Sequence, residues 1–314
     1  MILNCTLYRP INIFFQPSFS AGKTQKLKEF KEGLDTLLKW DELTHSKNNR
    51  VFISMKTDEL IKQAETFLQR QKESGFKITP FMIGITGASA SGKTFVKNLF
   101  LKLLSKQAES RQWNEQHHGP LIEDIAHDNF YLNQEHRRAS MTNIEFRKTT
   151  NLDEPKALRM DKLQQAVELF RSGVGLLLPH YDMITCRRTD NSAYKPPAPF
   201  MILEGIFALL NQPLHHCFDL KIYVDTDTNT ISRRWWDRAE SRGISNDEGG
   251  QAQFQKVMEM YKKHIEPTKE HANVVLNGSV PETTLKEAVQ GFSNLLLKTF
   301  YPIQTSEFEP QADD

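Results

Sequence analysis

Apolar residues in the middle of the chain alternate between short continuous runs and longer periodic stretches. The short runs are typical of buried strands and stand at 81–86, 121–126, 200–203, 220–224 and 272–276. Stretches with apolar residues at helical spacing lie at 95–104, 161–172 and 282–299. Strands that alternate with helices predict a mostly parallel sheet with helices on both faces.

The first 79 residues follow a different pattern. Helical periodicity spans 26–43 and 58–72, and loops rich in Ser, Asn and Lys separate the two stretches. We therefore expect an N-terminal helical extension over 1–79, which either packs on the core domain or mediates homo-oligomerisation. An α/β domain is expected over 80–300. Residues 301–314 are acidic and polar, which predicts a disordered tail.

Composition narrows the class of protein without identifying a function. The chain has 314 residues, 39% of them hydrophobic, and a formal net charge of +1, so no global charge attracts nucleic acid or an anionic membrane. Its three cysteines, Cys5, Cys186 and Cys217, lie far apart, which disfavours a disulfide framework or zinc site and fits the cytoplasm. No apolar run reaches the length of a membrane span. We expect a cytoplasmic protein that binds neither nucleic acid nor membrane.

The most specific motif of the chain joins the first of these strands to the helix that follows it. It fits G-x-x-x-x-G-K-[ST] and consists of Gly87, Ala88, Ser89, Ala90, Ser91, Gly92, Lys93 and Thr94. Successive backbone N–H groups in such a turn, together with the helix N-terminus, cradle phosphate groups. From the solvated tip of this loop Lys93 can reach the β- and γ-phosphates, while the Thr94 hydroxyl can bind Mg²⁺. The motif predicts a P-loop NTPase-type sheet that binds a nucleotide.

Three acidic residues, Asp128, Glu204 and Asp225, stand at or just past the ends of predicted strands. Because the carboxyl ends of parallel strands meet at one edge of the sheet, these carboxylates are expected near the phosphate loop. Phosphoryl transfer needs an acid for the metal or for the nucleophile's proton. Asp128 suits the base and Glu204 suits the metal, although either could merely cap a helix or lie in a solvated loop.

A predicted helix after residue 228 carries an arginine stripe. Arg234, Arg238 and Arg242 are spaced four residues apart and so share one face. Such a stripe can close over phosphates as a lid. It could equally be a solvated face, paired in part with Asp237 and Glu240. A third reading, binding of single-stranded nucleic acid, has no support from the net charge.

Two other site classes find little support. The histidines at 180, 215, 216, 264 and 271 lack the spacing of metal ligands. No Asn-Lys-x-Asp sequence follows the phosphate loop, which weakens a GTPase interpretation.

Several further motifs follow one another over residues 82–278. They are the phosphate loop, Asp128–Tyr131, Asn151–Pro155, Pro179–Asp182, Glu204–Ile206, Asp219–Asp225, Arg233-Arg234 with Arg242-Gly243, Pro267–Lys269 and Ala272–Val274. In this order they resemble the uridine–cytidine kinase family, within the wider group that includes phosphoribulokinase and pantothenate kinase. The resemblance implies an ATP- and Mg²⁺-dependent kinase that phosphorylates the 5′-hydroxyl of uridine or cytidine.

The resemblance also implies roles for single residues. Asp128 would be the general base and Asp153 would bind the ribose 2′- and 3′-hydroxyls. Thr94 and Glu204 would hold Mg²⁺. Beside Lys93, the catalytic groups would include two lid arginines, Arg234 and Arg242. The remaining acceptor-binding positions implied are Tyr131, Tyr181, Cys186 and Arg188.

The chain departs from the family pattern at three places. Cys186 stands where the family usually has a base-reading histidine. In the lid, Asp237-Arg238 inverts the usual Arg-Asp pair and Ile244 replaces an arginine. The helical N-terminal stretch is not part of the core family. Phosphoryl transfer is therefore better supported than the identity of the base. Two alternatives remain open: a kinase for a sugar phosphate, pantothenate or glycerate, and a nucleotide-binding switch that hydrolyses ATP slowly and acts through the N-terminal helices.

Overall fold

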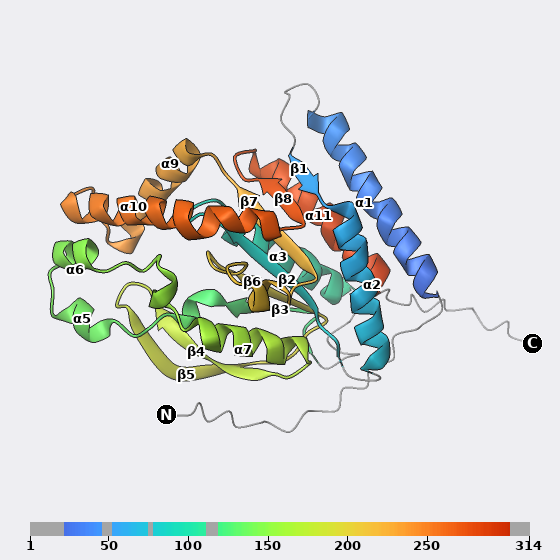
Figure 1. The fold of residues 1–314 in the computed structure, drawn as a ribbon, viewed down its shortest axis with the longest axis horizontal. Coiled ribbons are helices and arrows are strands. Elements are labelled where there is room, and N and C mark those ends of the chain that lie inside the picture. Colours follow the sequence, from blue (N-terminus) through green and yellow to red (C-terminus); the bar gives the residue numbers. More distant parts are fainter. Residues whose placement is uncertain (1–21, 46–51, 75–77, 111–118, 302–314) are drawn as a thin grey trace, which may run out of the picture.

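The computed structural model describes residues 22–45, 52–74, 78–110 and 119–301, and the predicted tail beyond Tyr301 lies outside these ranges (Figure 1). A six-stranded sheet in the order β1–β8–β7–β2–β6–β3 forms the centre. Its strands are β1 (Ile53–Met55), β2 (Phe81–Gly87), β3 (Ile122–Ala126), β6 (Phe200–Glu204), β7 (Leu220–Asp225) and β8 (Val274–Asn277). Neighbours from β8 to β3 pair in parallel, which confirms the predicted α/β fold.

Helices cover both faces of this sheet, also as predicted (Figure 1). The longer ones are α1 (Lys23–His45), α2 (Thr57–Glu73), α3 (Lys93–Ser110), α7 (Met160–Arg171), α9 (Thr228–Ala239), α10 (Glu248–Met260) and α11 (Glu282–Phe300). Short helices are α5 (Glu135–Ala139), α6 (Asn143–Thr149) and α8 (Gln212–His215), and a separate antiparallel hairpin is formed by β4 (Leu176–Asp182) and β5 (Arg187–Lys195). No helix of the described ranges is long and apolar enough to cross a membrane.

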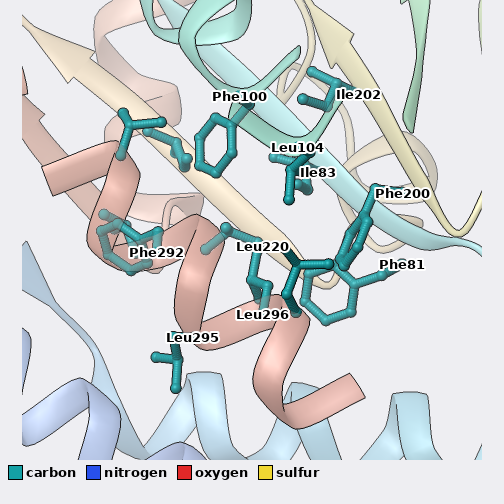
Figure 2. Packing of buried hydrophobic residues seen from close by; sticks show 14 of the residues in the cluster. Phe81, Ile83, Phe100, Leu104, Phe200, Ile202, Leu220, Phe292, Leu295 and Leu296 are labelled. Carbon is teal, nitrogen blue, oxygen red and sulfur yellow. The ribbon is translucent and has the colours of Figure 1, made fainter. Parts of the chain in front are cut away.

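Alternate residues of the phosphate-loop strand enter two different cores. Phe81 and Ile83 of β2 face α3 and α11, where Figure 2 shows Phe100 and Leu296 gathered against the sheet. Met82, between them in sequence, joins the opposite core, which α7 covers. Because successive side chains of a strand point to opposite faces, a strand buried on both faces reads as a continuous apolar run.

The N-terminal extension adds a strand that the helical pattern did not predict. β1 pairs antiparallel with β8 at the edge of the sheet. The extension also shares the main core, because the Phe67 ring of α2 lies 5.0 Å from Phe81 and 5.1 Å from Phe300. Deletion of this segment would expose a sheet edge and an aromatic core. We therefore expect the N-terminal extension to stabilise the α/β domain.

A buried ion pair joins the extension to the phosphate-loop strand. Arg70 of α2 donates to Asp219 at 2.8 Å, and the same carboxylate accepts from the backbone N–H of Met82. The Asp219 side chain is only 1% exposed, and burial raises its pKa. Removing one partner of such a pair leaves a buried charge uncompensated.

We therefore expect Arg70→Met to lower the free energy of unfolding by about 3 kcal/mol. The measurement is urea unfolding followed by circular dichroism. Lys72→Met is the matched control, because Lys72 is an exposed cation on the same helix. Equal midpoints for the two variants would show that the pair does not hold α2 to the sheet.

Candidate active site

The phosphate loop takes its shape from two glycines between β2 and α3. Gly87 has φ +148°, and a Cβ there would lie 2.6 Å from the carbonyl oxygen of Val224. Gly92 has φ +102°, a conformation that side chains rarely allow. Ala90 adopts φ 66° without being glycine. This turn precedes the N-terminus of α3, so its N–H groups and the helix dipole favour an anion here.

Lys93, Thr94 and Glu204 form one contact cluster at the mouth of the loop. The Glu204 carboxylate lies 3.7 Å from the Lys93 ammonium and accepts a hydrogen bond from the Thr94 hydroxyl at 3.2 Å. The Lys93 side chain is 9% exposed, so the expected solvated tip is wrong. Arg238 of α9 closes over the loop by donating to Ser89 at 3.1 Å. Burial lowers the pKa of Lys93, although Glu204 opposes the shift.

The Thr94–Glu204 pair fits a magnesium ion. A hydroxyl and a carboxylate already in contact are hard oxygen donors, and Mg²⁺ typically takes one or two protein oxygens and completes its shell with phosphates and water. Within the described ranges no cluster of three or more His, Cys, Asp or Glu side chains is arranged to hold a metal. A site shared with phosphate is therefore the kind of metal site these residues suit.

Asp128 follows β3 and faces the same cluster. Its carboxylate is 57% exposed and contacts Nδ1 of the buried His127 at 3.3 Å. Burial of its surroundings raises the pKa of Asp128, but the hydrogen bond and charge of His127, with Lys93 and Arg242, outweigh this effect, so the pKa lies below its ordinary value. Asp128 is thus an ionised, accessible carboxylate.

Asp153 is a second carboxylate with the opposite electrostatics. It lies in the loop between α6 and α7, where its backbone N–H donates to the Asn151 side chain at 3.1 Å. Burial raises the pKa of Asp153 to about 6, although Lys93 opposes the shift. Two carboxylates in one site thus titrate over different pH ranges.

The three arginines predicted to share one helix face make different contacts, because α9 ends at Ala239 and Arg242 lies in the turn that follows it. Arg234 donates to the backbone carbonyls of Gly278 at 2.9 Å and Ser91 at 3.4 Å, so it braces the loop from outside the cavity. Arg238 and Arg242 line the cavity. Burial and the neighbouring Arg242 lower the pKa of Arg238 to about 10, which leaves it charged at neutral pH.

Eight of the predicted site residues meet in one cavity of about 100 Å³. Those that line it are Ser89, Lys93, Thr94, Asp128, Tyr131, Asp153, Glu204 and Arg242. Cys186 lines an adjoining cavity, while Tyr181, Arg188 and Arg234 line neither. The third strand-end acid, Asp225, pairs with Lys269 and also lies outside.

The β4–β5 hairpin supports the cavity from behind. The Tyr181 ring lies 5.3 Å from that of Tyr131, and the Tyr181 backbone N–H donates to the side-chain oxygen of Asn129 at 3.1 Å. Arg188 pairs with Tyr181 across the hairpin. Cys186 is 2% exposed and takes φ 53° in the turn, and burial raises the pKa of its thiol.

Two residues at the cavity carry roles that the sequence reasoning missed. His127 orients Asp128, and a Cβ at Gly205 would lie 2.2 Å from its ring, so the glycine makes room for it. Arg238 was predicted to share a helix face with Arg234 and Arg242, and spacing alone did not say that Arg238 and Arg242 line the cavity while Arg234 does not. For His127 the signal was its position directly before Asp128.

The chain is similar to several known proteins. The sequence profile described as "Phosphoribulokinase / Uridine kinase family" matches residues 82–285. Uridine kinase from Lactococcus lactis subsp. cremoris (strain MG1363) is 34% identical over 203 residues, which are 64% of this chain and 90% of that protein. Uridine kinase from Staphylococcus carnosus (strain TM300) is 35% identical over 196 residues, 62% of this chain and 86% of that protein.

A solved structure shows a more distant likeness. Phosphoribulokinase from Rhodobacter spheroides is 16% identical, with 62% of this chain and 68% of that chain covered and a TM-score of 0.46. The matched residues of the profile begin within β2, so α1, β1 and α2 precede the matched region.

Proposed function

This chain belongs to the phosphoribulokinase/uridine kinase family, and from that premise we propose that it transfers the γ-phosphoryl group of ATP to the 5′-hydroxyl of a pyrimidine ribonucleoside. The observation that carries the proposal is the meeting of Lys93, Asp128 and Asp153 in one cavity. Lys93 belongs to a phosphate cradle, Asp128 suits the role of general base, and Asp153 suits the binding of a diol. The relatives named uridine kinase support the choice of acceptor.

The proposed chemistry starts at the acceptor hydroxyl. Asp128, ionised and accessible, takes the hydroxyl proton as the oxygen attacks the γ-phosphorus, while the bond from that phosphorus to the β–γ bridging oxygen breaks and ADP leaves. Lys93, Arg238 and Arg242 then stabilise the negative charge on the transferring group. Thr94 and Glu204 would hold Mg²⁺, which neutralises charge on the β- and γ-phosphates when bound.

Asp153 distinguishes a kinase from a nucleotide-binding switch. An ionised carboxylate can accept hydrogen bonds from two neighbouring hydroxyls, as a ribose 2′,3′-diol offers. A switch that only hydrolyses ATP does not need a diol-binding carboxylate beside its general base. The N-terminal helices, through which a switch would act, pack into the main core.

The direct test is a coupled assay of ADP release with Mg·ATP. Uridine, cytidine, a purine nucleoside and 2′,3′-dideoxyuridine serve as acceptors, and water alone is the control. We expect acceptor-dependent turnover with the pyrimidine ribonucleosides and poor turnover with the dideoxy compound. ADP release that no acceptor stimulates would favour the switch.

Base selectivity gives a further prediction at Cys186. A buried thiol is a weak hydrogen-bond donor, whereas histidine can donate or accept at a base edge and tolerates positive φ better than most residues. We expect Cys186→His to raise kcat/KM for uridine or cytidine roughly tenfold, since one hydrogen bond is worth about 1–3 kcal/mol when its loss leaves a buried group unpaired. The control is Thr185→His at the exposed neighbouring position. A fall in parent activity on introducing the histidine would show that the pocket reads the base by another route.

A further inference from the structure

One carbonyl group of the phosphate loop, that of Ser91, is held from outside the active-site cavity. The Thr226 hydroxyl donates to this oxygen at 2.8 Å, and the Arg234 guanidinium donates to it at 3.4 Å. Thr226 is buried, and neither it nor Arg234 lines the active-site cavity or the cavity beside it. Two side chains outside the cavity therefore fix one peptide group of the loop that shapes it.

This peptide group joins Ser91 to Gly92, and its orientation decides which of its atoms faces a bound phosphate. In a trans peptide the C=O and N–H bonds point in opposite directions. Because Thr226 and Arg234 bind the Ser91 carbonyl on the outside, the N–H of Gly92 points back into the loop. An inward N–H attracts a phosphate oxygen, whereas an inward carbonyl oxygen would repel it.

The neighbouring peptide groups are held by the backbone itself. The Ser91 N–H donates to the Ala88 carbonyl at 3.0 Å, and the Gly92 carbonyl accepts from the Val96 N–H at 3.1 Å. Between them, Gly92 has the backbone freedom that lets a peptide plane rotate. The covalent chain does not fix the plane between Ser91 and Gly92, so its orientation depends on the side chains that bind the carbonyl.

The close approach of β8 to this carbonyl requires a glycine at position 278. A Cβ there would lie 2.2 Å from the Thr226 hydroxyl and 2.6 Å from the Ser91 carbonyl oxygen. The Gly278 carbonyl accepts from Arg234 at 2.9 Å, and its N–H donates to the backbone oxygen of Asp225 at 2.6 Å. The ends of β7 and β8 thus meet behind the loop and direct Arg234 toward it.

Thr226 is fixed in turn by the start of α9. The next residue, Asp227, caps this helix by accepting from the backbone N–H of Thr230 at 2.8 Å. The Ser279 hydroxyl donates to the same carboxylate at 2.6 Å. These hydrogen bonds, that of Ser279 foremost, lower the pKa of Asp227 to about 2, so the cap is ionised at neutral pH. The place of the Thr226 hydroxyl is therefore set by the junction of β7, β8 and α9.

We propose that Thr226 is a positioning residue for nucleotide binding: with Arg234 it locks the Ser91–Gly92 peptide so that the Gly92 N–H faces the phosphates. We call these two donors and the Ser91 carbonyl the peptide lock. The inference rests on the phosphotransferase activity proposed above, and it gives Arg234 a positioning role in place of a direct catalytic one. A threonine that merely satisfies a buried carbonyl would affect stability and not phosphate binding.

The decisive variant is Thr226→Val, which removes the hydroxyl and keeps the shape of the side chain. Calorimetry with Mg·AMP-PNP and, separately, with magnesium tripolyphosphate measures phosphate binding with and without the nucleoside. We expect both affinities to fall roughly tenfold, as for the loss of one hydrogen bond to a charged group. Parental affinity for both probes in the folded variant would overturn the peptide lock.

Two matched variants separate positioning from stability. Thr226→Ser keeps the hydroxyl and should restore the parental affinities. Thr228→Val makes the same change at an exposed position of α9 and should keep both affinities within about twofold, as is usual for a surface substitution. The melting temperature of each variant is measured alongside. An affinity loss that follows the melting temperature, or that serine does not restore, would reduce Thr226 to a structural role.

Steady-state kinetics with uridine test the peptide lock in turnover. Thr226→Val should raise KM for ATP roughly tenfold and leave kcat and KM for uridine within about twofold, because a contact made equally in the ground and transition states changes KM alone. Arg234→Met should raise the same KM.

The binding and kinetic measurements together separate this inference from the proposed function. Weaker binding of both phosphate probes by Thr226→Val, in a protein whose parent shows no acceptor-dependent turnover, would uphold the peptide lock and overturn the kinase. Acceptor-dependent turnover with a parental KM for ATP in Thr226→Val would uphold the kinase and overturn the peptide lock.

Discussion

Lys93→Ala should slow phosphoryl transfer by about two to three orders of magnitude while the protein stays folded. The Lys93 ammonium starts from the helix end of the phosphate loop, 3.7 Å from Glu204, where a γ-phosphate would replace part of its present contact. A preorganised cation in a site of low hydration contributes more to a charged transition state than it would in water. Its loss should lower kcat by about 10²–10³, equivalent to about 3–4 kcal/mol.

The control for this variant is Lys97→Ala, one turn further along α3. Lys97 pairs with Asp124 at 3.1 Å and does not line the cavity. Both variants should keep the circular dichroism of the parent, and only Lys93→Ala should lose turnover. Near-parental kcat in folded Lys93→Ala would overturn the assignment of the phosphate loop.

The strands and the phosphate loop could be predicted because their sequence signals are local. β2, β6 and β7 are buried on both faces, so they read as continuous apolar runs that end in a glycine or an acid. The loop motif needs two glycines, and both take the positive φ values that the turn demands. Because the carboxyl ends of parallel strands meet at one edge of the sheet, Glu204 and Asp128 could also be predicted to lie near the loop.

The rest depends on contacts between distant segments. β1 has three residues, too few to show an alternating pattern, and it forms only because β8 offers an open edge. The arginine stripe showed a shared face but not which side chain would enter the cavity, since that depends on how α9 packs over the loop. The cavity that Cys186 lines collects its wall from segments that are more than 100 residues apart, such as those of Arg138 and Lys256.

Asp128→Asn and Asp153→Asn should fail in different ways. Asp128 acts on the hydroxyl proton in the transition state, so Asp128→Asn should lower kcat by about 10²–10⁴ with little change in ATP affinity. Asp153 holds the acceptor in both ground and transition states, so Asp153→Asn should chiefly raise KM for the acceptor, by roughly tenfold or more for a lost charge-assisted hydrogen bond. Loss of ATP affinity alone in both variants would show that the roles are wrong.

The pH profile of kcat/KM separates the two carboxylates, because their pKa values are shifted in opposite directions. Asp153 can accept charge-assisted hydrogen bonds from both hydroxyls only when it is ionised, and its pKa is raised to about 6, so kcat/KM for the acceptor should fall as the pH drops below about 6. The pKa of Asp128 is lowered, so this base stays ionised through that range and does not cause the fall. In Asp153→Asn the limb near pH 6 should vanish, because the amide does not titrate. A limb that persists in this variant would assign the titration to another group and remove Asp153 from acceptor binding.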